Sequence, residues 1–220
     1  MDYQAIALSL RLAAVTSLIL LAVGVPLAYW IAFSPRRWKF LVEAVVALPL
    51  VLPPTVLGFY ILLAISPRSP AGALYAKLTG GLLPFSFAGL VVASVLYSLP
   101  FMVQPVATAF GTVDRKLIEA SWCLGISRAA TFRRVVAPLA RAGIATGVIL
   151  TFAHTLGEFG VVLMVGGNIA GVTRTVSISI YDQVQGLNYA AAGQTSLFLL
   201  VVSFAVLAAT YALGRRFRLV

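Results

Sequence analysis

Five stretches of the chain are each long and apolar enough to cross a lipid bilayer, and this feature decides most of what the chain can fold into. A spanning helix needs about 20 predominantly apolar residues. The chain is 61% hydrophobic and 10% charged, whereas soluble domains are about 45–50% apolar and about 25% charged. The sequence therefore predicts an all-α, polytopic transmembrane helical protein of about five spans. The stretches cover residues 5–33, 40–65, 88–111, 142–166 and 195–214.

The basic residues are divided unevenly between the segments that connect these stretches. Residues 34–39, 112–141 and the tail after 214 together hold 12 of the 16 lysines and arginines. Because basic residues in short loops stay in the cytoplasm, we expect the N-terminus outside and the C-terminus in the cytoplasm. This topology, with contact to anionic lipid, accounts for the net charge of +10 without nucleic-acid binding.

Prolines interrupt the second stretch, where Pro49, Pro53 and Pro54 lie within six residues. Each proline removes a backbone donor and clashes with the preceding turn, and carbonyls freed in hydrocarbon must be satisfied by protein or by cavity water. We expect the second span to unwind or bend here. Two interpretations stay open: a helix that lines or hinges around a pathway, and a kink that improves packing.

The segment 112–141 is long for a connection between adjacent helices. Its pattern predicts two short amphipathic helices that are separated at Gly125, where glycine permits the left-handed turn that ends a helix. We expect Asp114 to cap the first helix, Ser127 to cap the second and Pro138 to stop the second before the next span. The first helix has an incomplete apolar face formed by Leu117, Ala120, Trp122 and Leu124.

The same segment resembles the EAA loop of ABC importer permeases. That pattern runs Glu-Ala-Ala, three residues, Gly, nine residues, an aliphatic residue, one residue and Leu-Pro. Ser121 replaces the second alanine and Ala137 replaces the leucine, and neither changes the spacing. The resemblance implies a pair of coupling helices that docks on a cytoplasmic ATPase; the alternative is an ordinary surface loop. The matching residues are Glu119, Ala120, Ser121, Gly125, Val135 and Pro138.

The fourth stretch carries two ionisable residues, His154 and Glu158. Ionisable side chains at membrane depth are candidates for function. Because they are four residues apart on a helix, the two side chains would share a face and could hydrogen-bond. Two interpretations of this pair stay open, a structural role and a functional role. Gly157 and Gly160 are expected to let another backbone approach closely.

A longer resemblance, to the molybdate ABC-transporter permeases, covers nearly the whole chain. It is carried by Leu-Gly-Glu-Phe-Gly at 156–160, by Asn-Ile-x-Gly-x-Thr-Arg-Thr at 168–175 and by the Leu-Pro-Leu-Val-Leu-Pro-Pro run at 48–54. The resemblance implies a type I ABC importer permease (MetI-like) core in a bacterial inner membrane. It also implies a single permease domain over residues 1–220, with a coupling loop at 112–141 and an external segment at 167–192. This external segment is too polar to span unaided, and we expect its stretch 173–184 to form a short helix that dips into the external face.

The implied function is that of the membrane-spanning pore subunit of an ATP-driven importer for molybdate or tungstate. The implied partners are a second copy of the chain in a homodimer, a cytoplasmic ABC ATPase dimer, a periplasmic molybdate-binding protein and membrane lipid. A sulfate/thiosulfate-type ABC permease is the alternative. No GxxxxGK[ST] run occurs in the sequence, so we expect ATP on the partner ATPase and no cofactor in this chain. With no HExxH, no CxxC and one histidine, we expect no metal site.

A further set of residues are candidates for the translocation path or its gate. Arg174, with Thr173 and Thr175, could present donors to an oxyanion at the outer mouth, because the guanidinium fork suits such anions. Alternatively, Arg174 anchors the segment or pairs with Asp182. A membrane-embedded enzyme that uses His154 and Glu158 is the alternative of another class, although we expect no catalytic residue. The candidates are Pro49, Pro53, Pro54, His154, Glu158, Thr173, Arg174 and Thr175.

Overall fold

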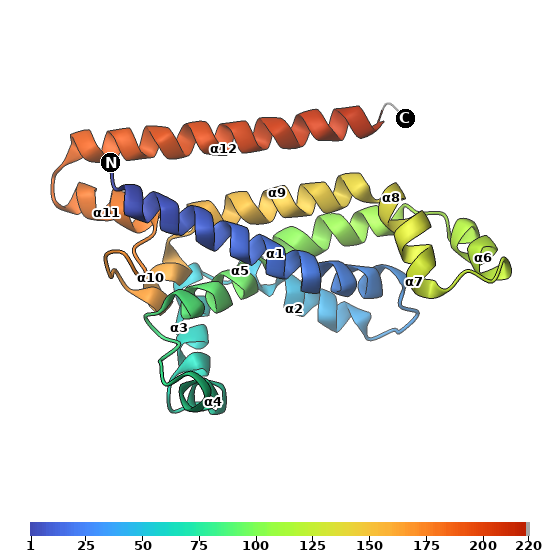
Figure 1. Cartoon of the computed structure of the whole chain (residues 1–220), viewed down its shortest axis with the longest axis horizontal. Helices are drawn as coiled ribbons and strands as arrows, with labels where there is room; N and C mark the ends of the chain where they lie inside the picture. The colour runs from blue at the N-terminus through green and yellow to red at the C-terminus, as the bar shows by residue number, and fades with distance from the viewer. Residues whose placement is uncertain (219–220) are drawn as a thin grey trace.

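The computed structural model describes residues 1–218, with the backbone alone for 213–218, and its regular structure over this part is entirely helical (Figure 1). The side chains of Arg215, Arg216 and Arg218, counted above in the predicted cytoplasmic set, lie outside the described part. The helices are α1 (Tyr3–Phe33), α2 (Lys39–Val51), α3 (Pro54–Ile65), α4 (Pro70–Thr79), α5 (Phe87–Gly111), α6 (Arg115–Cys123), α7 (Arg128–Thr131), a π-helix (Phe132–Val136), α8 (Ala137–Leu139), α9 (Arg141–Gly157), α10 (Gly160–Gly166), α11 (Val176–Gln185) and α12 (Tyr189–Arg218).

Three described helices are long and apolar enough to cross a membrane by themselves: α1, α5 and α12 as far as Ala212. The number rises to as many as five if each of two bent helix pairs counts as one span. One pair is α2 with α3, bent by 116°, and the other is the run Arg128–Leu139 with α9, bent by 76°. The predicted all-α, polytopic fold is therefore confirmed, with three to five candidate spans. The predicted stretch 40–65 is divided between α2 and α3, and the predicted stretch 142–166 between α9 and α10.

Helices α1, α5 and α9 form the centre of the bundle (Figure 1). Small residues bring their backbones close together, as is usual where lipid supplies no hydrophobic drive between helices. A methyl group added to Gly24 of α1 would lie 2.8 Å from Cγ of Met102 of α5. One added to Gly147 of α9 would lie 3.0 Å from the carbonyl oxygen of Met102. Met102 is fully buried, so this residue is the common contact of the three helices.

Helix α12 lies along one side of the bundle, against α9 and α11 (Figure 1). Its most apolar window is 6% buried, and large side chains such as Leu200, Phe204 and Tyr211 are exposed. An apolar surface of this kind suits contact with lipid or with another chain. The helix begins at Tyr189, before the expected start at 195, because the side-chain oxygen of Asn188 accepts the backbone N–H of Ala191 at 3.2 Å.

Most connecting segments lie at two opposite ends of the bundle, whereas the segment that holds α4 projects from one side (Figure 1). The turn between α1 and α2, together with α6, α7 and α8, lies at one end. The N-terminus, α10, α11 and the start of α12 lie at the other. This arrangement separates the segment 112–141, which is predicted to be cytoplasmic, from the segment 167–192, which is predicted to be external.

Candidate translocation path and coupling segment

Helix α6 begins and ends as the sequence predicts. Oδ1 of Asp114 accepts the N–H of Lys116 at 2.9 Å at its start. At its end Gly125 has φ 74°, and the N–H of Ile126 donates to the carbonyl of Ser121 at 3.1 Å. The N–H of Gly125 donates to the carbonyl of Trp122 at 2.9 Å. These two bonds form a Schellman motif, which satisfies carbonyls that a helix end otherwise leaves free.

Ser121 and Thr131 connect the two helices of the predicted coupling pair. Their hydroxyl oxygens are 2.8 Å apart, and both residues are buried. Ser127 caps α7 by accepting the N–H of Ala130 at 3.3 Å, as predicted. Because the hydroxyl of Ser121 reaches α7, the residue that departs from the Glu-Ala-Ala pattern holds the pair together.

Large apolar side chains of the coupling pair face outward. Leu117 is 49% exposed, Trp122 43% and Leu124 79%. Ile118, by contrast, is 4% exposed and packs into the main core cluster. The expected apolar face is therefore present, but its members are available to a partner instead of being covered by this chain. Glu119 and Ala120 are exposed, and Val135 is half-buried.

Pro138 does not end the second coupling helix as expected. The helical run continues through α8 to Leu139, and the bend comes at Ala140. Proline cannot donate to the carbonyl four residues before it, and the turn immediately before it is a π-helix, Phe132–Val136. The widened turn accommodates the proline inside the run, so the direction changes two residues later.

The second span breaks where its prolines are densest. Helix α2 ends at Val51, and Leu52 and Pro53 are extended, with ψ 137° and 136°. Pro54 then takes the first position of α3, where its missing N–H has no helical partner to lose. Pro49 lies buried inside α2. The density of prolines at 53–54 therefore produces the predicted break, and Pro49 alone does not.

The fourth span breaks at Glu158, which was not expected. Helix α9 ends at Gly157, and Glu158 is extended, with φ −67° and ψ 138°. Its carboxylate turns forward, and Oε1 accepts the N–H of Val161 in the first turn of α10 at 2.8 Å. The carboxylate thus satisfies a free donor at a helix start. The expectation that Glu158 shares a helix face with His154 is wrong, because the helix stops between the two residues.

The two broken spans meet at their breaks. A methyl group on Gly160 would lie 2.7 Å from Cβ of Pro54, and one on Gly58 would lie 2.8 Å from Cβ of Met164. Glycine at 58 and 160 therefore lets α3 and α10 pack closely, as predicted for Gly160. Gly157 has nothing within 4 Å of such a methyl group, so the same prediction for Gly157 is wrong.

His154 finds its partners on α5 instead of at Glu158. Its Nδ1 is 3.0 Å from the hydroxyl of Ser98, and that hydroxyl is 2.9 Å from Oγ1 of Thr155. The imidazole stacks on Phe101, with 3.8 Å between ring centroids. Sequence reasoning missed Ser98 because a serine in an apolar helix has no local signal that marks a partner 56 residues away.

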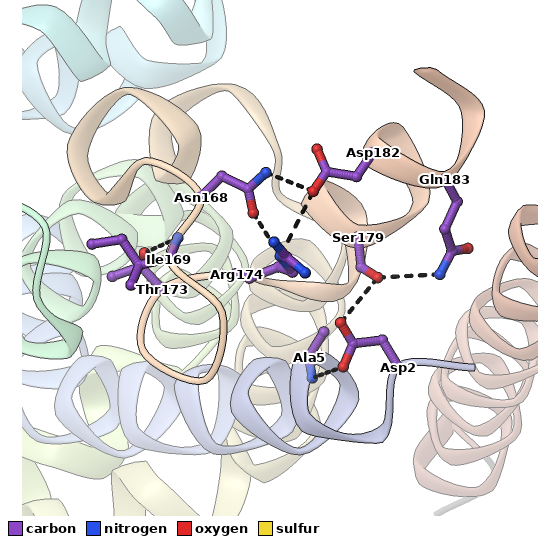
Figure 2. Close-up of polar contacts among 9 residues, drawn as sticks. All are labelled: Asp2, Ala5, Asn168, Ile169, Thr173, Arg174, Ser179, Asp182 and Gln183. Carbon is purple, nitrogen blue, oxygen red and sulfur yellow. Dashed lines mark hydrogen bonds and ion pairs between the residues drawn. The ribbon is translucent and has the colours of Figure 1, made fainter. Parts of the chain in front are cut away.

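Arg174 belongs to a polar network at the end of the bundle that holds the N-terminus, which Figure 2 shows. Its Nε donates to Oδ1 of Asn168 at 2.7 Å and lies 3.6 Å from Oδ2 of Asp182. The amide of Asn168 donates to the same Asp182 oxygen at 2.6 Å. The pairing of Arg174 with Asp182, one of the two alternatives, is confirmed.

The threonines that flank Arg174 are buried. Oγ1 of Thr173 accepts the N–H of Ile169 at 3.1 Å, and Thr173 and Thr175 are 0% and 2% exposed. The expected short external helix is present as α11. Thr173 and Arg174 therefore hold the segment 167–192 together through side-chain contacts, whereas Oγ1 of Thr175 is buried with no hydrogen-bond partner in the part of the chain that the structure describes. The role of the three residues toward an anion stays a prediction.

The candidate residues fall into three separate places. Pro54 contacts Gly160, which follows Glu158 by two residues, His154 lies against α5, and the residues at 173–175 lie in the segment that is predicted to be external. The coupling residues lie at the opposite end of the bundle (Figure 1). The segment predicted to be external and the segment predicted to be cytoplasmic therefore lie at opposite ends of the bundle, and both broken spans belong to the same chain.

Comparison with known proteins agrees with this arrangement. The family described as "Binding-protein-dependent transport system inner membrane component" matches residues 24–219. The molybdenum transport system permease protein ModB of Azotobacter vinelandii is 52% identical over 99% of this chain and 96% of its own. ModB of Escherichia coli (strain K12) is 35% identical over 84% of this chain and 80% of its own.

Solved structures share the fold. The crystal structure of a bacterial ABC transporter that imports the acidic polysaccharide alginate matches with a TM-score of 0.75 and 17% identity, over 97% of this chain and 79% of that one. The alginate transporter in complex with its pentasaccharide-bound periplasmic protein matches with a TM-score of 0.77 and 18% identity, over 97% and 78%. The chain therefore belongs to the binding-protein-dependent transport system inner membrane components, multi-pass membrane proteins, and among them to the molybdenum transport permeases.

Proposed function

We propose that this chain is the pore subunit of an ATP-driven importer that brings molybdate, or tungstate, across the inner membrane. The observation that carries the proposal is the coupling pair α6–α7, held by the Schellman turn at Gly125 and presenting exposed Leu117, Trp122 and Leu124. The 52% identity to a molybdenum permease over nearly the whole chain supports molybdate as the cargo.

The energy comes from a pair of separate ABC ATPase subunits that bind ATP, and this chain has no P-loop of its own. The exposed Leu117 and Leu124 of the coupling pair would sit in a groove on each ATPase, with Trp122 beside the end of α1. A periplasmic molybdate-binding protein delivers the anion to the outer face. The likeness to a transporter solved with its periplasmic protein supports this partnership.

A second copy of the chain completes the path. An open cleft of about 510 Å³ lies among α1, α2 and α5, and Glu43, Gln104 and Thr108 line it together with apolar residues. Polar side chains on the exposed face of a span are costly against lipid. A homodimer that covers this cleft would place these groups in an aqueous path between the two copies.

A single helix, α9, connects the coupling pair to the break in the fourth span. Helix α9 follows α8 directly and ends at the break at Glu158, where α10 packs on α3. When the ATPases close on ATP, the coupling helices would move with them, and α9 would carry that motion to the contact of Gly160 with Pro54. We propose that this contact, where two spans break, is where the path opens and closes.

The proposed orientation has the N-terminus outside and the C-terminus in the cytoplasm. The excess of basic residues beside the coupling pair supports it, and so does the need for that pair to reach a cytoplasmic ATPase. The chain is not proposed to be an enzyme. His154 stacks on Phe101 and contacts the hydroxyl of Ser98, which is 1% exposed, so this group offers no nucleophile to a substrate.

The test is deletion of the gene, followed by mass spectrometry of cellular molybdenum and tungsten at scarce external oxyanion, with labelled sulfate uptake alongside. Three genes are returned to the deletion strain: the wild type, Gly125→Pro and Gly80→Pro. Gly125 and Gly80 are matched because each ends a helix, with φ of 74° and 71° respectively, and the backbone N–H of each donates to a carbonyl of that helix. Proline cannot adopt a positive φ and has no N–H to donate.

We expect molybdenum to fall in the deletion strain, with sulfate uptake unchanged. The wild type and Gly80→Pro should restore molybdenum, and Gly125→Pro should not, although it reaches the membrane. A loss of sulfate uptake alone would show that the cargo is sulfate. Normal molybdenum with Gly125→Pro would overturn the coupling role of α6–α7.

A further inference from the structure

Two neighbouring hollows lie between the end of α1 and the coupling helices. Tyr29, Phe33 and Trp122 line both hollows. The smaller hollow, of about 140 Å³, is also lined by Arg115, Ile118 and Glu119. The larger hollow, of about 350 Å³, lies beside the turn from Ser34 to Arg36. We call the two hollows together the aromatic–arginine cleft.

The larger hollow is basic. Arg36 and Arg128 line it, and each guanidinium lies over a tryptophan ring: Arg36 at 5.5 Å from the centroid of Trp38, and Arg128 at 5.6 Å from that of Trp122. Among the described residues, no carboxylate lies within ion-pair distance of either arginine. An arginine fixed on an aromatic ring keeps its N–H donors free for an anion.

The smaller hollow has a different character. Arg115 supplies donors there, and Glu119 supplies an acceptor. A carboxylate would repel a second anion, so the anion belongs in the larger hollow beside Arg36 and Arg128. The pair of Arg115 and Glu119 instead suits neutral hydroxyl groups, which both donate and accept hydrogen bonds.

The cleft opens beside surface that suits the membrane interface. The three tryptophans of the chain, Trp30, Trp38 and Trp122, all lie at or beside the cleft, and tryptophan favours the boundary between lipid and water. Trp38, Phe40 and Leu41 at the start of α2 are 47%, 59% and 55% exposed. An occupant with a phosphate in the cleft could therefore lay an apolar tail along α2.

We propose that the aromatic–arginine cleft binds the headgroup of an anionic phospholipid of the cytoplasmic leaflet. The phosphate lies between Arg36 and Arg128, the headgroup hydroxyls lie toward Arg115 and Glu119, and the acyl chains follow the start of α2. Basic pockets between spans at the cytoplasmic face are a known way for proteins to hold such headgroups. A glycerol headgroup carries the hydroxyls that this cleft matches, so phosphatidylglycerol is the probe.

A bound headgroup would connect two parts of the chain that move differently in the proposed function. Arg36 belongs to the turn between α1 and α2, whereas Arg128 begins α7 of the coupling pair. The lipid would bridge them and hold the coupling pair against the end of α1. The anionic lipid content of the membrane would then influence how readily the ATPases move the coupling helices. Naming the leaflet rests on the proposed orientation, but lipid binding itself does not depend on the cargo.

The purified full-length chain is placed in vesicles of brominated phosphatidylcholine, which quenches tryptophan fluorescence. A small fraction of unbrominated phosphatidylglycerol is then added. Lipid that is selected by the cleft should restore the fluorescence of wild-type protein far beyond its share of the membrane. The double variant Arg36→Gln/Arg128→Gln should lower this preference by roughly 25-fold, since each basic residue near anionic lipid contributes roughly fivefold.

The matched control is Arg37→Gln/Arg134→Gln, which removes the same charge from the same end of the chain without touching the cleft, and should keep the wild-type preference.

If the fluorescence of wild-type protein recovers merely in proportion to the added phosphatidylglycerol, the proposal is overturned whether or not the variants fold. Equal recovery with soluble glycerol phosphate would overturn it in favour of a free-anion site. Unchanged lipid preference in Arg36→Gln/Arg128→Gln, with loss of ATPase copurification, would overturn it in favour of a protein-docking surface. The readout needs neither molybdate nor ATP, so it stands apart from the transport test.

Discussion

Gly160 of α10 packs on the ring of Pro54 of α3, and at this contact the breaks of two different spans meet. One break has prolines as its cause, whereas the other is stabilised by the carboxylate of Glu158. Helices that are broken within the bilayer usually mark the part of a transporter that handles cargo or moves. Substitutions at this contact therefore test the proposed transport mechanism most sharply.

We expect Gly160→Ala to push α10 away from α3, because the new methyl group would lie 2.7 Å from Cβ of Pro54. Overpacking of this kind costs about 1–3 kcal/mol, so the variant should lose thermal stability in detergent and lose uptake. Gly157→Ala is the matched control, since its methyl group meets nothing within 4 Å. Equal effects from the two alanines would show that the contact is not special.

The role of Glu158 can be separated into hydrogen bonding and charge. Glu158→Gln keeps an oxygen that accepts the N–H of Val161, so we expect uptake and thermal stability close to those of the wild type. Glu158→Ala removes the acceptor at a buried helix start and should cost about 1 kcal/mol. If the glutamine variant fails as badly as the alanine variant, the negative charge itself is needed.

Ser121 and Thr131 should act as a pair. Ser121→Ala and Thr131→Val each remove one side of the 2.8 Å contact between the coupling helices. A double-mutant cycle should give a coupling energy of about 1 kcal/mol, the net value of one hydrogen bond. Hydrogen exchange of the amides in 125–131 measures the opening of the pair, and additive effects of the two substitutions would contradict the contact.

Substitutions at Arg174 and Asp182 distinguish the two interpretations of the external arginine. If Arg174 holds the external segment through Asn168 and Asp182, Arg174→Ala and Asp182→Ala should lower uptake alike, and the double variant should be little worse than either. If Arg174 instead meets the anion, Asp182→Ala should leave uptake unchanged or raise it, because the arginine loses its competing partner. Initial uptake rates of labelled molybdate decide between the two.

Local signals predicted much of the coupling segment, because its turns depend on residues that are close in sequence. Asp114, Gly125 and Ser127 each act on a backbone group within three residues. The break at Pro53 and Pro54 is likewise local, since it follows from the missing N–H groups. Patterns of this kind need no knowledge of the neighbouring helices.

The errors concern residues whose structure depends on distant partners or on competing local bonds. The pair His154 and Glu158 suggested one helix face, but the buried carboxylate bonds forward to Val161 and the imidazole meets Ser98 of α5. Pro138 suggested a stop, but the π-turn at Phe132–Val136 absorbs it. Hydrophobic periodicity predicts neither the bonds of His154 and Glu158 nor the π-turn before Pro138.

The conversion of ATP hydrolysis by a partner into molybdate import is the role proposed for coupling helices α6 and α7. Its most direct test is uptake of labelled molybdate into proteoliposomes that hold the permease and its ATPase, with ATP inside the compartment that the ATPase faces and the loaded binding protein on the other side. The account predicts uptake that requires both ATP and the binding protein, that survives Gly80→Pro and that is abolished by Gly125→Pro. Uptake without ATP, or undiminished uptake with Gly125→Pro, would contradict it.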